Sequence, residues 1–165
     1  GEHYCRVFNR IYNLDTIVLR YFNVFGPRQR ADSPYAAVIP RFIRSLCEDQ
    51  RPIIYGDGKQ SRDFCYVENV IQANLLCVEA GEAAIGACMN IAGGKGHTVN
   101  ELLARLCDIV GKKVDPLHLA PRPGDVRHST ANIGLAQRLL GYQPVVGFEE
   151  GLRRTVEWFG SLPLL

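Results

Sequence analysis

The sequence predicts an α/β fold, because stretches with helical and with strand patterns alternate along the chain. Residues 67–80 and 98–110 place apolar side chains at helical spacing, which predicts two amphipathic helices. The run 16–22 is β-branched and aromatic, which predicts a buried strand. We find no internal repeat, so the pattern is that of an ordinary α/β unit and not of a repeat array.

Turn-forming residues divide the first half of the chain. An apolar face over residues 2–13 predicts a helix, and Gly26-Pro27 and Ser33-Pro34 indicate a loop. In chain order, the expected elements are a helix over 2–13, a strand over 16–22, a loop over 23–34, a helix over 38–49, a strand over 52–55 with a turn over 56–58, an extended segment over 63–67 and a helix over 67–80.

The second half contains the clearest helix start. Thr98 can cap a helix, Glu101 three residues later completes a capping box, and Gly111 is suited to ending that helix. The other expected elements are a strand over 88–92, a glycine-rich loop over 93–96, a helix over 98–110, a strand over 114–119, a polar loop over 121–130 and helices over 133–140 and 148–159.

Composition places the chain among globular proteins of one ordinary domain. It has 165 residues, of which 47% are hydrophobic and 22% are charged, so it can bury a core without metals or disulfides. The net charge of +2 is too small to indicate a nucleic acid or an anionic membrane as partner. No run reaches the ~18 apolar residues that suggest a membrane span, and no signal-peptide pattern is found.

The six cysteines form no Cys-x-x-Cys pair and no Cys/His cluster with zinc spacing. Most lie in apolar runs, as in Leu46-Cys47 and Leu76-Cys77. We therefore expect buried free thiols and a cytoplasmic location.

Two short motifs resemble known sites but lack the required geometry. Tyr55 and Lys59 have the Tyr-x-x-x-Lys spacing of a motif that needs a helix to bring the ammonium beside the phenol, whereas Gly-Asp-Gly between them is a turn sequence. The run 92–98 is a glycine-rich turn, but Val99 stands where the third glycine of G-x-G-x-x-G would fall. We interpret both segments as connections between elements.

Three polar segments follow predicted strands, where open α/β sheets bind ligands. Asn23 comes directly after the strand 16–22 and can direct its amide into such a crevice. Arg62 and Arg122 can form bidentate bonds to phosphate oxygens, and Asp125 can accept from paired sugar hydroxyls. From chemistry alone, surface ion pairing is the more common role of each arginine, so these segments do not identify a ligand by themselves.

Four motifs in order make a resemblance specific. They are Leu19-Arg-Tyr-Phe-Asn-Val-Phe-Gly-Pro-Arg28, Tyr35-Ala-Ala-Val-Ile-Pro40, Gly56-Asp-Gly followed by Ser61-Arg-Asp-Phe-Cys-Tyr66, and Arg122-Pro-Gly-Asp-Val-Arg-His-Ser129. With them the chain resembles the extended short-chain dehydrogenase/reductase enzymes that act on nucleotide sugars, and most of all UDP-N-acetylglucosamine/UDP-glucose 4-epimerases. The resemblance covers essentially the whole chain.

The resemblance implies a division of the chain. Residues 1–23 would be the last helix and strand of a Rossmann domain, 24–160 a small nucleotide-sugar-binding α/β lobe, and 161–165 a tail. The glycine-rich NAD fingerprint and the Tyr-x-x-x-Lys set of the family's N-terminal half are not found in the sequence. The chain opens on Gly1-Glu2 in a helical pattern without an initiator Met, so we expect its start to be a cut just past the catalytic Lys.

The resemblance also implies roles for single residues. Asn23, Arg62 and Arg122 would bind the diphosphate of a UDP-sugar, and Asp125 would bind its ribose. These four assignments rest on the matching motifs and not on the spacing of the residues.

Five further roles follow from the same motifs. Ala37, Val38 and Tyr55 would enclose the uracil and the sugar, and Tyr21 would lie near the nicotinamide and the hexose. Ser129 matches a pocket-wall position where a bulky residue restricts the enzyme to plain hexoses and a small one admits an N-acetyl group. Because Ser129 and Ala37 are small, the intact enzyme is expected to accept N-acetylated sugars.

The implied activity is a 4-epimerase reaction that uses NAD as redox cofactor. We expect NAD to bind the intact enzyme and not this chain alone, so the chain alone would be inactive. One alternative is a fragment of a nucleotide-sugar dehydratase or decarboxylase. Another is a stand-alone module for nucleotide-sugar binding or dimerisation.

The expected partners are a UDP-sugar and a second copy of the chain, with no nucleic acid and no membrane. In similar epimerases the helix that matches 2–13 contributes to a two-fold helical bundle, which implies a homodimer. The strand 16–22 would lack its sheet neighbours from the N-terminal half, and its exposed edge also favours self-association.

Overall fold

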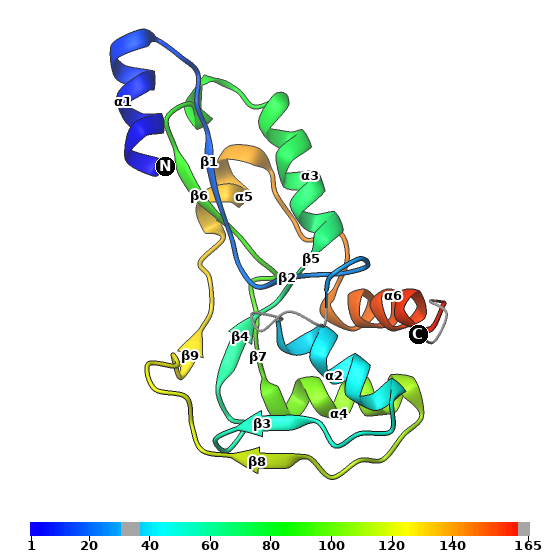
Figure 1. The fold of residues 1–165 in the computed structure, drawn as a ribbon. Helices are drawn as coiled ribbons and strands as arrows, with labels where there is room; N and C mark the ends of the chain where they lie inside the picture. The colour runs from blue at the N-terminus through cyan, green and yellow to red at the C-terminus, as the bar shows by residue number, and fades with distance from the viewer. Residues whose placement is uncertain (31–36, 162–165) are drawn as a thin grey trace.

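The computed structural model describes residues 1–30 and 37–161 and shows an α/β fold in two sections, with β2 and β5 between them (Figure 1). The upper section in Figure 1 contains α1 (Glu2–Tyr12), β1 (Val18–Tyr21), α3 (Val67–Val78), β6 (Cys88–Ile91) and α5 (Gly134–Leu140), and η1 (Glu82–Ala84) connects α3 to β6. The lower section contains α2 (Val38–Cys47), β3 (Ile53–Tyr55), α4 (Val99–Val110), β8 (Leu117–Leu119) and α6 (Phe148–Gly160).

A two-stranded parallel sheet forms the centre of the upper section. β1 pairs with β6 along its whole length, and α3 and α5 contact β6. Met89, Ile91 and Tyr142 are buried in the resulting core. The hydroxyl of Tyr142 donates to the carbonyl of Ala92 at 2.9 Å, so this buried polar group is satisfied.

Three helices enclose the core of the lower section. α2, α4 and α6 contact one another, and Leu46, Leu102, Leu106 and Leu152 are fully buried among them. β3 pairs in parallel with β8 and contributes Ile54 to the same core. The core therefore fixes α2 and β3, which both line the cavity described below.

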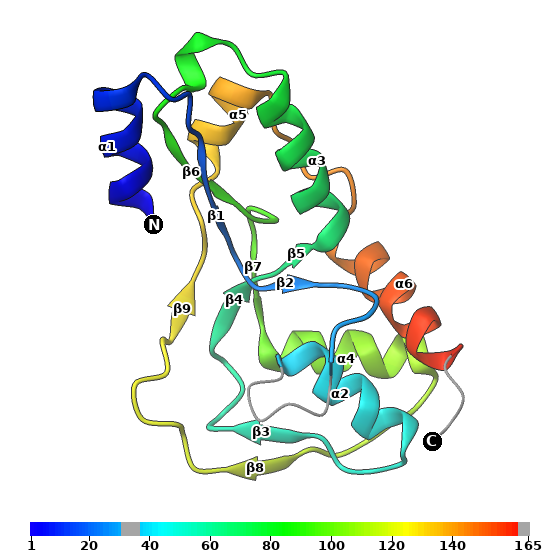
Figure 2. The same ribbon diagram turned by 45° about the horizontal axis from the view of Figure 1, so that its top comes forward.

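Short strands join the two sections. β2 (Val24–Phe25) pairs in parallel with β5 (Cys65–Tyr66). β4 (Ser61–Asp63) pairs antiparallel with β7 (Gly96–Thr98) and parallel with β9 (His128–Ser129). Figure 2 shows β4, β7 and β9 between the upper and the lower section, so segments far apart in the sequence meet there.

The predicted helices are confirmed, with ends shifted by a few residues. Thr98 and Glu101 form the predicted capping box: Thr98 Oγ1 accepts from Glu101 N, and the Glu101 carboxylate accepts from Thr98 N. Gly111 ends α4 in the left-handed region, with a φ of 74°. Within the described parts of the chain, every helix falls short of the length and apolarity that crossing a membrane requires.

Three of the predicted loops contain short strands. β2 lies within 23–34, β7 begins in the glycine-rich loop over 93–96, and β9 lies within 121–130. Each of these strands has two or three residues and is held by pairing with a distant strand, so the local sequence carries little signal for it. The strand expected over 114–119 is limited to β8, and residues 31–36 of the first loop lie outside the described residues.

Two expectations about burial are wrong. In β1, Arg20 and Tyr21 are exposed, because β6 is the one strand that pairs with β1 among the described residues. Of the cysteines, Cys65 is buried, Cys47 is exposed and the other four are partly buried. All six are free thiols, as expected.

The carboxylate of Asp63 lies buried where the short strands meet. Its Oδ1 accepts from Gly93 N at 2.9 Å and Gly94 N at 3.1 Å, and its Oδ2 accepts from Ala131 N at 3.1 Å. Burial raises the pKa of the Asp63 carboxyl, whereas these backbone donors stabilise the charged form and oppose the rise. One side chain thus fixes β4, the turn after β6 and the segment before α5.

Replacing Asp63 with asparagine should lower the free energy of unfolding by about 2 kcal/mol or more, because the new amide group would face backbone donors that it cannot satisfy. Urea unfolding followed by circular dichroism measures this change. The matched control is Asp49→Asn, since Asp49 is exposed and pairs with Lys112, and it should stay within about 0.5 kcal/mol. Equal destabilisation by both variants would contradict the role of Asp63.

Candidate functional site

A cavity of about 350 Å³ lies where α2, β3, β4 and the segment 122–125 converge. Val38, Phe42 and Ile54 contribute apolar side chains to its wall. Phe42 and Ile54 also belong to the core of the lower section. The wall is therefore anchored in packed structure, as is usual for a preformed ligand site.

Three arginines and one aspartate give the cavity its charge. Arg41 comes from α2, Arg62 from β4, and Arg122 and Asp125 from the loop between β8 and β9. Arg62 and Asp125 form an ion pair, and the Arg62 guanidinium also donates to the Ser61 carbonyl at 2.7 Å. Among the described lining residues three guanidiniums face one carboxylate, an excess of positive charge that suits an anionic ligand.

The phenol of Tyr55 interacts with two of these arginines. The guanidinium carbon of Arg122 is 3.9 Å from the centre of the Tyr55 ring, which is a cation–π contact. Hydrogen bonding from Arg122, followed by that from Arg41, lowers the pKa of the Tyr55 phenol, because a cation beside the oxygen favours the phenolate. The Gln60 amide donates to the Tyr55 carbonyl at 2.8 Å and fixes the end of β3.

The cavity brings together five of the nine residues that the sequence analysis singled out. They come from α2, β3, β4 and the loop after β8, so the fold unites segments that are far apart in the sequence. Their roles in ligand binding stay predictions. The five are Val38, Tyr55, Arg62, Arg122 and Asp125.

Two more of the predicted residues lie next to lining residues. Ala37 directly precedes α2 and is followed by Val38. Ser129 lies opposite Arg62 in the pairing of β9 with β4. Tyr35 and Ala36, which begin the second motif, lie outside the described residues.

Asn23 and Tyr21 are outside the lining of the cavity. Asn23 has a left-handed backbone with a φ of 35°, and its side-chain amide donates to the Asp63 carbonyl at 2.8 Å. Tyr21 ends β1 and is 47% exposed. Its hydroxyl donates to Asn74 Oδ1 at 3.0 Å, so it is held against α3.

Arg41 and Gln60 line the cavity but were not identified from the sequence. Arg41 follows Val38 by three residues in α2, so helical spacing places both on one face. That spacing is a usable signal once Val38 is assigned to a site. Gln60 has no comparable signal, because its position depends on the turn between β3 and β4.

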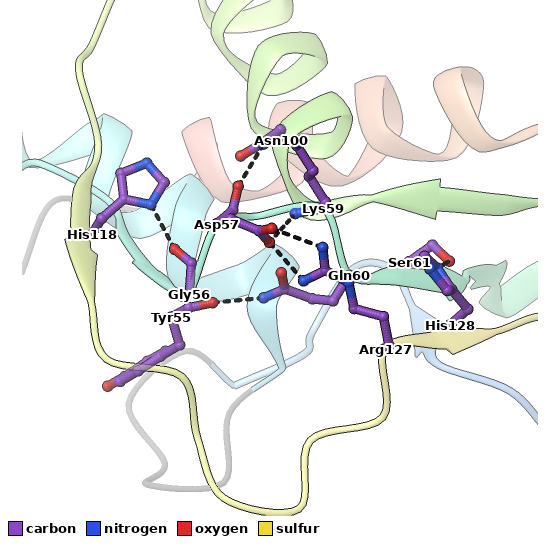
Figure 3. A network of polar contacts seen from close by, with 10 residues as sticks. All are labelled: Tyr55, Gly56, Asp57, Lys59, Gln60, Ser61, Asn100, His118, Arg127 and His128. Carbon is purple, nitrogen blue, oxygen red and sulfur yellow. Dashed lines mark hydrogen bonds and ion pairs between the residues drawn. The ribbon is translucent and has the colours of Figure 1, made fainter.

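The structure agrees that the segment from Tyr55 to Lys59 is a turn (Figure 3). Tyr55 ends β3, and Gly56 and Gly58 have φ values of 76° and 71°. These left-handed conformations suit glycine and exclude the helix that a catalytic Tyr-x-x-x-Lys requires.

The glycine-rich turn after β6 binds a side chain of the protein itself. The amides of Gly93 and Gly94 donate to the Asp63 carboxylate, and the chain continues into β7 and not directly into a helix. A dinucleotide cradle needs free amides at a helix start. This turn therefore does not fit the pyrophosphate of NAD.

Comparison with known proteins identifies the family. The family model described as NAD dependent epimerase/dehydratase matches residues 1–92. A putative UDP-glucose 4-epimerase from Methanocaldococcus jannaschii is 37% identical over 158 residues, which are 96% of this chain and 50% of that protein. A UDP-N-acetyl-alpha-D-glucosaminuronate decarboxylase and dTDP-glucose 4,6-dehydratases are also similar. The chain belongs to the NAD-dependent epimerase/dehydratase family.

Two solved structures share this fold closely. UDP-glucose 4-epimerase from Thermotoga maritima, solved with UDP-glucose, matches with a TM-score of 0.91 and 42% identity, over 96% of this chain and 50% of that chain. UDP-N-acetylglucosamine 4-epimerase from Methanobrevibacter ruminantium, in complex with UDP-N-acetylmuramic acid, matches with a TM-score of 0.91 and 45% identity. The match covers 97% of this chain and 51% of that chain. The chain spans about half the length of the curated relatives it matches.

Tyr55 should titrate below the ordinary tyrosine pKa of about 10, and Arg122→Ala should raise its pKa toward that value because the main stabilisation of the phenolate is lost. Ultraviolet difference spectra of the chain and of Tyr55→Phe isolate this residue among the seven tyrosines. Arg105→Ala, which removes an arginine paired with Glu149 away from the cavity, is the control. A Tyr55 pKa that is the same in Arg122→Ala as in the parent chain would contradict the interaction of Arg122 with the Tyr55 phenol.

Proposed function

We propose that the chain is the C-terminal, substrate-binding part of a UDP-sugar 4-epimerase. The observation that carries this proposal is the convergence of three guanidiniums and one carboxylate on one cavity with an apolar wall. Family membership supports it, as do the UDP-sugars in the similar solved structures.

Each part of a UDP-sugar has a complementary group at the cavity. Arg62 and Arg122 can donate bidentate hydrogen bonds to the diphosphate. Asn23 lies outside the cavity lining and uses one N–H for the Asp63 carbonyl; we propose that its second N–H bonds the diphosphate in the intact enzyme. Asp125 can accept from the ribose hydroxyls, and Ala37, Val38 and Tyr55 can enclose the uracil and sugar.

The pairing of Arg62 with Asp125 prepares the site for its ligand. The side chain of Arg62 is 19% exposed and that of Asp125 is 37% exposed, so both are partly held by the protein before a nucleotide arrives. Side chains that are already ordered lose less conformational entropy on binding. The ion pair therefore orients both side chains before the nucleotide binds.

Chemistry in the intact enzyme requires the other half. The family is NAD-dependent, and the bound cofactor would supply hydride transfer. We propose that this chain binds and orients the sugar nucleotide, that Tyr21 lies near the nicotinamide and hexose in the intact protein, and that the chain alone is inactive. Its contribution is positioning, which can lower a reaction barrier by several kcal/mol, on the order of 7–11 in the best cases.

Two other functions compete with this proposal. Similarity to nucleotide-sugar dehydratases and a decarboxylase favours a fragment of such an enzyme. An additional acid/base pair in the N-terminal half would identify a dehydratase or decarboxylase. A stand-alone module must bind a nucleotide sugar without any partner, so it would be excluded if the chain alone showed no binding.

We also propose that the intact enzyme accepts N-acetylated sugars. Ser129 is small and lies opposite Arg62 in the β4–β9 pair, and Ala37 at the start of α2 is small as well. We propose that position 129 lies in the pocket wall beside the sugar, where a bulky side chain would leave no room for an N-acetyl group. A similar epimerase that was solved with UDP-N-acetylmuramic acid supports this proposal.

The apolar face of α1 supports self-association. None of the residues of α1 is buried; Tyr4, Val7, Phe8 and Ile11 are between 44% and 73% exposed. A contiguous exposed apolar face is typical of a surface that contacts another protein. We propose that α1 of one copy packs against α1 of a second copy in a homodimer.

Titration calorimetry of the chain with UDP and UDP-N-acetylglucosamine tests the proposed function. We expect saturable micromolar binding of both ligands. Arg62→Ala should weaken UDP binding by at least about tenfold, because a charge-assisted hydrogen bond contributes roughly 1.5–3 kcal/mol. Arg105→Ala, which removes an arginine that pairs with Glu149 and is not among the lining residues of the cavity, should leave the affinity unchanged.

The same titrations separate the sugar from the nucleotide. Ser129→Tyr should weaken binding of UDP-N-acetylglucosamine and leave binding of UDP unchanged. No binding by the unaltered chain would mean that it is an inert fragment. An unchanged affinity of Ser129→Tyr for the N-acetylated ligand would remove the pocket-wall role of Ser129.

Light scattering at high protein concentration should show species larger than a monomer. Phe8→Glu should shift them toward monomer, because a charge on the apolar face of α1 cannot be buried without a partner. Leu75→Glu is the matched control on α3, where Leu75 is 64% exposed, and should leave the association intact. A chain that is monomeric at every concentration contradicts the proposed dimer.

A further inference from the structure

The loop that carries Arg122 and Asp125 has no buried side chain to hold it. Residues 117–128 are all exposed, so apolar packing does not fix their position. Groups that bind a ligand must nevertheless be placed within about half an ångström to act together. Hydrogen bonds and ion pairs must therefore position this loop.

The contacts of the ligand groups themselves cannot hold the loop during binding. Asp125 pairs with Arg62, and Arg122 lies over the ring of Tyr55. A nucleotide that binds to these groups competes for the same donors and acceptors. The loop needs anchors outside the cavity if Arg122 and Asp125 are to stay in place.

Both ends of the loop are attached to the turn between β3 and β4 (Figure 3). At its start, Gly56 N donates to the Leu119 carbonyl at 2.8 Å, and His118 Nδ1 lies 2.7 Å from the Gly56 carbonyl. At its end, the Arg127 guanidinium donates two hydrogen bonds of 2.7 Å to the Asp57 carboxylate. Ser61 N also donates to the Arg127 carbonyl at 2.9 Å, so the loop is closed onto the turn and onto the start of β4.

The start of α4 makes this turn a firm support. The Asn100 side chain donates to the Asp57 carbonyl at 2.9 Å, and Asn100 N donates to the Gly58 carbonyl at 3.0 Å. Lys59 N donates to Asp57 Oδ1 at 3.0 Å, which orients the carboxylate toward Arg127. A Cβ at Gly58 would lie 1.9 Å from Asn100 Oδ1, so the turn and α4 are in close contact.

We propose that Asp57 and Arg127 are positioning residues for the nucleotide site. Their ion pair links α4, through the turn, to the loop and keeps Arg122 and Asp125 facing the cavity. Asp57 and Arg127 are not part of the main cavity lining; they line a neighbouring space of about 250 Å³, to which Arg122 and Asp125 also contribute. This inference rests on the nucleotide-binding function proposed above and names the residues that set its geometry.

Calorimetric titration of UDP into Arg127→Ala, Asp57→Asn and the double variant tests this role. Each single variant should bind UDP about fivefold more weakly, because the loop then occupies the competent position for only part of the time. The double variant should bind no more weakly than either single variant, since both remove one shared interaction. Arg105→Ala is the matched control, because Arg105 also belongs to an exposed ion pair.

Hydrogen exchange gives a second readout that needs no ligand. Asp125 N donates to the Arg122 carbonyl at 3.2 Å, so its exchange reports on the order of the loop. Exchange over 121–126 should be faster in Arg127→Ala than in the parent chain and unchanged in Arg105→Ala. The urea midpoint should stay unchanged in Arg127→Ala, because the Asp57–Arg127 pair is exposed and exposed pairs contribute little to stability. A shifted midpoint would instead indicate that the pair has a purely structural role.

The outcomes separate this inference from the function on which it rests. Weaker binding in Arg127→Ala with unchanged binding in Asp57→Asn would make Arg127 a direct ligand and overturn the positioning role. Unchanged affinity and exchange in both variants would overturn it as well. No UDP binding by the parent chain would overturn the proposed function, and the exchange rates would still decide whether the pair positions the loop.

Discussion

The buried carboxylate of Asp63 is the contact on which the arrangement of the cavity depends. The carboxylate accepts hydrogen bonds from the backbone amides of Gly93, Gly94 and Ala131. The backbone carbonyl of Asp63 accepts a further hydrogen bond from the side-chain amide of Asn23. These bonds tie together the ends of β1 and β6, the strand β4 and the segment before α5. Because Arg62 precedes Asp63 in β4, its guanidinium enters the cavity from a point fixed by a buried polar network, where an unpaired group would be costly.

The opposite side of the cavity is held by exposed contacts and not by a buried network. The loop with Arg122 and Asp125 is exposed and depends on hydrogen bonds and ion pairs to the turn at Asp57. Exposed pairs are weak and are screened by salt. The site thus joins a wall that is held by the packed core to a wall that is held by exposed polar contacts.

The sequence predicts what local signals encode. Helical periodicity located the helices, and Thr98 with Glu101 identified the start of α4 because a capping box is formed by residues three apart. β2, β7 and β9 could not be predicted, since strands of two or three residues exist through long-range pairing. The ion pair of Asp57 with Arg127 joins positions that are 70 residues apart. No local sequence pattern indicates this pair, because it forms only when the chain folds.

Amide NMR shifts during a UDP titration locate the nucleotide most directly. Binding between α2, β3 and the loop predicts large shifts at Tyr55, Gln60, Arg62 and residues 121–125, with little change in α1 and α3. Shifts confined to the glycine-rich turn at Gly93 or to the helices α1 and α3 would contradict this placement. So would a spectrum that stays unchanged at high concentrations of UDP.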